Sequence, residues 1–123
     1  MSLHGNYDDN NIFAKILRSE IPAVKVYEDD VALAFMDLFP QATGHTLVIP
    51  KVAARNFIEF PGDFLGSYMQ RVQSVAKAVT KALSPDGVRV MQFNGWTRVH
   101  GVELAQCEQD DLRVIEKIEG LTC

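Results

Sequence analysis

Residues 11–51, NIFAKILRSEIPAVKVYEDDVALAFMDLFPQATGHTLVIPK, decide the fold. The stretch begins with a helical pattern, because apolar side chains recur on one face of residues 12–17, and Pro22 ends the helix. Asn10 or Asn11 precedes the helix as a candidate cap. Three short apolar segments then predict strands, at 25–28, 32–36 and 45–50. Since Asp29-Asp30 is a turn signal, we expect the first two strands to form a hairpin.

The next part of the chain predicts one long helix and one further strand. Pro61-Gly62-Asp63 opens the helix, and Ser84-Pro85-Asp86-Gly87 ends it. The apolar residues between them follow the 3- and 4-residue spacing of a stripe that faces a core. Residues 88–93 predict a buried strand that ends at an Asn94-Gly95 turn. We therefore expect an α+β domain, an antiparallel meander sheet with one short and one long helix on one face.

The C-terminal segment, 102–121, shows no strand alternation. Its large aliphatic residues recur every three positions, and they are Leu112, Ile115, Ile118 and Leu121. Gly120 suits the C-terminal end of a helix. We therefore predict an amphipathic helix here, which covers either the core of this chain or a second subunit.

Composition limits the possible functions. A chain of 123 residues is the size of one domain, and it is long enough for a core without disulfide bonds. Its net charge of −4 argues against binding nucleic acid through phosphate neutralisation. No apolar run reaches the length of a membrane span, so we expect no membrane partner. Cys107 and Cys123 have neither CxxC nor metal-ligand spacing, so we expect reduced thiols, a cytoplasmic location, and no bound metal or cofactor.

The order of these elements resembles the histidine-triad (HIT) family of nucleotide hydrolases and transferases. The stretch from YEDD through DLFPQATGHTLVIPK and the later segment DGVRVMQFNG carry the resemblance, which covers residues 11–95. It implies a small α+β domain that binds a nucleoside phosphate in a cleft. It also implies a homodimer formed through the long helix and the strand that follows it. In the family, a His-x-His-x-His run follows the Asn-Gly turn, and its middle histidine attacks the α-phosphorus.

The histidine run is absent from this chain, whose histidines are His4, His45 and His100. Counted from Asn94, the three triad positions fall near Leu104, Gln106 and Glu108. We therefore divide the chain into a flexible segment, 1–10, a HIT-like nucleotide-binding domain that lacks its triad strand, 11–95, and a divergent tail, 96–123. A change of reading frame, a rearranged gene end and an evolved feature would each produce such a tail.

The resemblance also implies which residues bind the nucleotide. Phe13 and Ile16 would enclose a purine base together with Leu38, and Asp37 would accept hydrogen bonds from both ribose hydroxyls. Asn94 would donate its amide to the phosphate. Each residue also has an ordinary alternative role. Phe13 and Ile16 suit the core stripe of a helix, Asp37 suits a solvated strand end, and Asn94 suits a turn before glycine.

Three further residues are candidates for catalysis. The resemblance implies that His45 supports the triad through a hydrogen bond, whereas the alternative is a structural histidine at the start of a strand. His100 and Cys107 lie near the expected nucleophile, but a lone histidine in a loop is usually solvated, and no positive charge beside Cys107 lowers its pKa.

Three functions remain open from the sequence. The first is a protein that binds a purine nucleotide weakly and has little or no hydrolase activity, because its nucleophile is missing. The second is a hydrolase in which His45, His100 or Cys107 rebuilds the site. The third is a dimeric interaction protein without catalysis.

Overall fold

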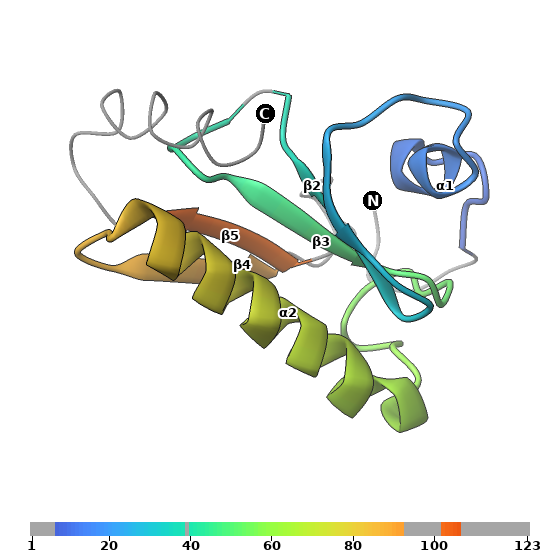
Figure 1. Cartoon of the computed structure of the whole chain (residues 1–123). Helices are drawn as coiled ribbons and strands as arrows, with labels where there is room; N and C mark the ends of the chain where they lie inside the picture. Colours follow the sequence, from blue (N-terminus) through green and yellow to red (C-terminus); the bar gives the residue numbers. More distant parts are fainter. Residues whose placement is uncertain (1–6, 39, 93–101, 107–123) are drawn as a thin grey trace.

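The computed structural model describes residues 7–38 and 40–92 together with the backbone of residues 102–106. It contains an antiparallel sheet with one short and one long helix, so the α+β prediction is confirmed (Figure 1). The elements in chain order are α1 (Ile12–Leu17), β1 (Lys25–Glu28), β2 (Ala32–Met36), β3 (Thr46–Pro50), α2 (Gly62–Leu83), β4 (Val88–Gln92) and β5 (Val102–Gln106). Asn11 caps α1, since its side chain accepts a hydrogen bond from the Ala14 N–H.

The strand order is β1-β2-β3-β5-β4, and it corrects two predictions about the end of the chain. Residues 102–106 form a strand instead of the start of a helix, so a strand does follow residues 94–95 in the chain, where none was predicted. β5 pairs antiparallel with β3 on one side and β4 on the other, so the meander extends only from β1 to β3. The backbone N–H and C=O groups of β5 form hydrogen bonds with β3 on one side and β4 on the other. This pairing determines the conformation of residues 102–106, because their local sequence pattern is weak. Residues 107–123, with the rest of the predicted tail helix, lie outside the described residues.

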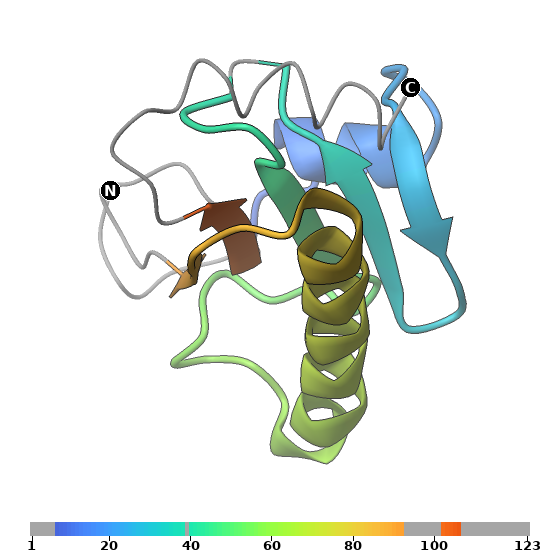
Figure 2. The ribbon, with the colours of Figure 1, turned by 60° about the vertical axis from the view of Figure 1, so that its left-hand side comes forward.

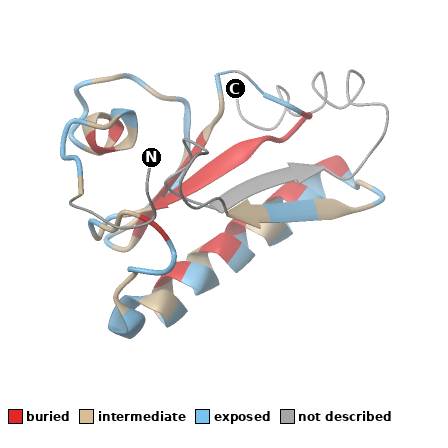
Figure 3. Cartoon of the chain, turned by 180° about the vertical axis from the view of Figure 1, so that it is seen from behind, coloured by how far each residue is buried: buried red, intermediate tan, exposed pale blue. Residues whose placement is uncertain are grey.

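The two helices cover opposite faces of the sheet, so the prediction that both lie on one face is wrong (Figure 2). Successive residues of a strand point to opposite faces. Ala32, Ala34 and Val48 therefore pack toward α2. On the other face α1 covers a second cluster, whose buried members are Ile16, Leu33, Phe35, Leu47 and Ile49. A strand that is buried on both faces needs apolar residues at nearly every position, as β2 and β3 have (Figure 3).

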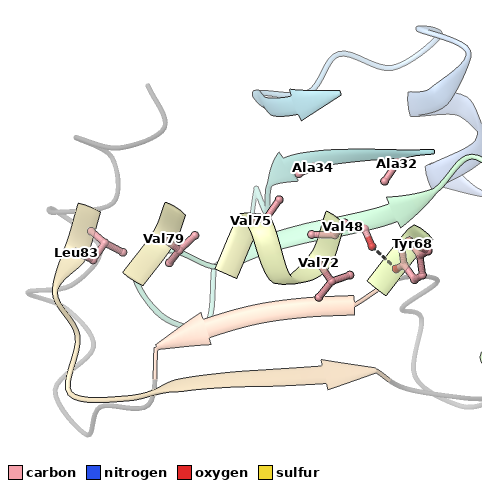
Figure 4. Packing of buried hydrophobic residues seen from close by; sticks show 8 residues of the cluster. All are labelled: Ala32, Ala34, Val48, Tyr68, Val72, Val75, Val79 and Leu83. Atoms are coloured by element: carbon pink, nitrogen blue, oxygen red, sulfur yellow. Dashed lines mark hydrogen bonds between the residues drawn. The ribbon is translucent and has the colours of Figure 1, made fainter. Parts of the chain in front are cut away.

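The long helix packs on the sheet through one apolar stripe, as its spacing predicts. The buried residues of the stripe are Tyr68, Val72, Val75, Val79 and Leu83 (Figure 4). Tyr68 also donates its hydroxyl to the Val48 carbonyl oxygen at 2.6 Å, which satisfies the polar end of a buried ring. Among the described residues, no helix is both long and apolar enough to cross a membrane.

One carboxylate joins the β1–β2 hairpin to α2. Asp29 Oδ1 accepts hydrogen bonds from the backbone N–H groups of Val31 and Ala32, at 2.8 and 2.9 Å. Asp29 Oδ2 accepts the Tyr27 hydroxyl at 2.7 Å and Nε of Arg71 at 2.8 Å. The Arg71 guanidinium first, and then the Tyr27 hydroxyl, lower the pKa of the Asp29 carboxyl well below its ordinary value of 3.8.

We predict that Asp29→Asn destabilises the fold by about 1 kcal/mol at neutral pH, since the charge is lost from a partly solvated network. The pKa of Asp29 is lower in the folded chain than in the unfolded chain, so its contribution is complete above the unfolded value and decreases as the pH falls below about 4. The difference in melting temperature between wild type and Asp29→Asn should therefore be constant from about pH 6 to pH 8 and shrink in acid. Asp30→Asn makes the same change at the neighbouring exposed residue and serves as the control. An equal loss of stability in both variants would contradict the role of Asp29.

Candidate functional site

The candidate site begins where β2 ends and β3 starts. The β2–β3 register pairs Met36 with Thr46, so the next residues outward, Asp37 and His45, lie opposite each other. Their backbones extend the pairing by one hydrogen bond, because the Asp37 N–H donates to the His45 carbonyl oxygen at 3.1 Å. By alternation along the strands, both side chains are on the face that carries α1.

The two side chains are in contact but differ in exposure. The His45 side chain is 1% exposed, whereas the Asp37 side chain is 22% exposed. Asp37 Oδ2 lies 3.5 Å from His45 Nδ1. The Gln41 backbone N–H donates to the same Nδ1 at 3.1 Å, so Nδ1 is an acceptor and the imidazole proton is on Nε2. The imidazole therefore accepts from a backbone N–H at Nδ1 and lies beside a carboxylate that solvent can reach.

The loop between Asp37 and His45 turns tightly back into the sheet. Residues 42–45 are buried, and Gly44 has a φ of 83°, a left-handed conformation that favours glycine. The His45 N–H donates to the Ala42 carbonyl oxygen at 3.2 Å, and the Thr46 hydroxyl donates to the Gly44 carbonyl oxygen at 2.9 Å. These bonds connect the loop to the first residues of β3.

The residues expected to enclose a base have different environments. Ile16 is buried in the cluster that α1 covers, as its ordinary role as a core residue predicts. Phe13 is half-buried, and its ring centroid lies 6.2 Å from that of Phe35, with 39° between the planes. Leu38 is 70% exposed directly after Asp37. The structure thus places Phe13 and Asp37 on the same face of the sheet, with Leu38 exposed directly after Asp37.

A model of the HIT domain matches residues 18–103, which is most of the chain. The chain belongs to the HIT family. Its fold agrees closely with the crystal structure of a HIT-like protein involved in cell-cycle regulation from Bartonella henselae. The TM-score is 0.83 at 42% sequence identity, over 95% of this chain and 98% of that one.

Two curated HIT relatives are similar in sequence to this chain. Protein hit of Bacillus subtilis is 40% identical over 87 residues, which are 71% of this chain and 60% of that protein. Adenosine 5′-monophosphoramidase HNT1 of Saccharomyces cerevisiae is 39% identical over 95 residues, which are 77% of this chain and 58% of that protein. The matched region is therefore less than two thirds of each of these relatives.

The expected triad positions of this HIT chain lie on or just beyond β5. Leu104 pairs with Thr46 of β3 and with Val90 of β4, and Gln106 pairs with Val88. The strand is therefore paired with the first residues of β3, but two of its expected triad positions are leucine and glutamine. The third position, Glu108, lies outside the described residues, as do Asn94, His100 and Cys107. Among the described residues, no three histidine, cysteine or acidic side chains are grouped closely enough for a metal ion.

Sequence patterns missed two features of this HIT domain. The first is the Gln41 N–H, because a backbone donor leaves no signature in side-chain motifs. The second is a hollow on the α2 face, lined by Pro50, Ala54, Asn56, Phe57, Phe60, Tyr68 and Gln92. The aromatic residues between 57 and 68 are the sequence feature that could have indicated this hollow. Their spacing does not show which face of the sheet they pack against.

Proposed function

We propose that this HIT-family chain binds a purine nucleoside 5′-phosphate weakly and has little or no hydrolase activity. The observation that carries the proposal is the partly exposed Asp37 carboxylate at the end of β2, on the same face as Phe13. A carboxylate with two acceptor oxygens on a rigid strand end suits the two hydroxyls of a ribose. Phe13 supplies an accessible aromatic surface for the base, and Leu38 an aliphatic one.

The relatives support adenosine as the nucleoside. The yeast relative is named as an adenosine 5′-monophosphoramidase, and it shares 39% identity over 77% of this chain. Because this chain spans only 58% of that protein, the substrate of the relative enters here as part of the proposal. The spacing of Cys107 and Cys123 supports a cytoplasmic location for the same molecule.

The proposed lack of hydrolysis follows from the residues of β5. Leucine has no group that attacks phosphorus, and the amide of glutamine is a poor nucleophile. Loss of a covalent nucleophile and its acid–base partners commonly reduces turnover by about four to six powers of ten. Binding and orientation of the nucleotide do not depend on the nucleophile and remain.

We also propose a homodimer that forms through β4 and α2. β4 is one edge of the described sheet, and its pairing with β5 is regular at all positions. The opposite edge, β1, has a register irregularity between Lys25 and Tyr27 and carries charged residues, which are features that disfavour edge pairing. Val90 of β4 is 53% exposed, so this edge also offers an apolar side chain.

For binding, we predict a dissociation constant for AMP on the order of tens to hundreds of micromolar. Asp37→Asn should weaken AMP more than 2′-deoxy-AMP, because the lost carboxylate accepts from the ribose hydroxyls. Isothermal titration calorimetry measures both, and Asp30→Asn at the far end of β2 is the control. Absence of heat with any purine nucleotide at millimolar concentration would overturn the nucleotide site.

For catalysis, we expect no turnover of adenosine 5′-phosphoramidate above background, measured by chromatography of the released AMP. If turnover is seen, His45→Ala, His100→Ala and Cys107→Ala identify the group responsible. Loss in one of these variants, with activity kept in the other two, would show a rebuilt hydrolase and contradict the proposal.

For assembly, Val90→Glu should convert the dimer to monomers in sedimentation velocity, since a charge at the pairing edge must be desolvated. Val24→Glu places the same charge beside the opposite edge, where the valine is 41% exposed, and should leave the dimer intact. A dimer that persists in Val90→Glu, or a monomeric wild type, would exclude this interface.

A further inference from the structure

We infer that His45 is a positioning residue for Asp37, and that it sets the preference of the site for ribose over 2′-deoxyribose. The inference rests on the proposed nucleotide site, but it gives His45 a role that does not depend on a histidine triad. The buried imidazole would act on the ligand through Asp37 and the loop between them.

Burial excludes direct recognition by the imidazole. The His45 side chain is 1% exposed, so a nucleotide on the surface does not reach it without a rearrangement of the loop. Asp37 is exposed to 22% and touches the imidazole, with Oδ2 at 3.5 Å from Nδ1. Any influence of His45 on a bound ribose therefore passes through the orientation of the Asp37 carboxylate.

Three polar groups of His45 fix the loop that carries Asp37. Its carbonyl oxygen accepts from the Asp37 N–H at 3.1 Å, and its own N–H donates to the Ala42 carbonyl oxygen at 3.2 Å. Its Nδ1 accepts from the Gln41 N–H at 3.1 Å. The first two bonds are backbone bonds that any residue except proline forms, whereas the third requires an acceptor on the side chain of residue 45.

The same bond decides how the imidazole meets the carboxylate. Because Nδ1 accepts from Gln41, the imidazole does not donate a proton to Asp37 Oδ2. A histidine that carried its proton on Nδ1 would donate to Oδ2 and compete with a ribose hydroxyl for that oxygen. The Gln41 N–H therefore keeps the carboxylate an acceptor for the hydroxyl donors of ribose.

Two substitutions at residue 45 distinguish the effect of the hydrogen-bond acceptor from the effect of side-chain volume. In His45→Asn, the amide oxygen is the same number of bonds from Cα as Nδ1, so an acceptor for the Gln41 N–H remains. In His45→Leu, a methyl group takes that place and the acceptor is lost. Loss of packing volume alone would weaken AMP and 2′-deoxy-AMP by the same factor in either variant.

The test compares dissociation constants of AMP and 2′-deoxy-AMP by calorimetry. We expect wild type to prefer AMP by about tenfold, the equivalent of one well-made hydrogen bond. His45→Asn should keep this ratio within about twofold, and His45→Leu should reduce it below about threefold. The double variant Asp37→Asn with His45→Leu should show the same ratio as Asp37→Asn alone, because both changes act on one interaction.

A wild-type ratio in a folded His45→Leu variant would overturn the inference and leave the nucleotide site standing. Absence of nucleotide binding to wild type would instead overturn the nucleotide site itself, and the inference with it.

A second measurement needs no variant, and it tests the hydrogen bond on which the inference rests even if His45→Leu does not fold. In ¹⁵N NMR spectra of the wild-type protein, His45 should show an unprotonated Nδ1 and a protonated Nε2, and the Gln41 amide should exchange slowly with solvent. A proton on Nδ1, or exchange of the Gln41 amide at the rate of an unprotected loop, would overturn the role of His45.

Discussion

The register between β2 and β3 is the constraint on which the rest of the structure depends. It sends Leu33, Phe35, Leu47 and Ile49 to the face that α1 covers, and Ala32, Ala34 and Val48 to the face that α2 covers. The same register puts Asp37 directly opposite His45, one step beyond the last strand pair. A slip by one residue would exchange the two faces and separate this pair. The packing of the core and the geometry of the site are thus two consequences of one alignment.

Much of this arrangement could be predicted from local patterns. The Asp29-Asp30 turn, the long apolar stripe of α2 and the proline at the end of β3 identify their elements correctly, because each depends on nearby residues. The faces of the sheet were predicted wrongly, although the nearly unbroken apolar runs of β2 and β3 are typical of strands buried on both sides. β5 was missed because residues 102–106 form a strand only through the open edges of β3 and β4, which no local pattern records.

For the candidate site, too, the sequence identified single residues, whereas their contacts with each other are visible only in the structure. Sequence resemblance pointed to Asp37 and His45 separately, and the structure adds that their side chains touch. It also shows that Ile16 belongs to the core, while Phe13 and Leu38 remain accessible. Nδ1 of His45 accepts from the backbone N–H of Gln41, four residues earlier in the chain. The direction of that N–H follows from the fold of the loop and not from the identity of residue 41. The geometry of the candidate site therefore depends on the fold of the loop as much as on any side chain.

The insertion of β5 between β3 and β4 also orders the events of synthesis. As the chain leaves the ribosome, β1, β2 and β3 emerge as a continuous meander, and α2 follows as a cover for one face. β4 emerges next, but its only described strand partner is β5, which is translated later. Until then both β3 and β4 present open backbone edges, and such edges on a nascent chain are targets for pairing with other chains. The last described strand to be synthesised thus closes the sheet from the middle, and it leaves β1 and β4 as the two edges of the described sheet.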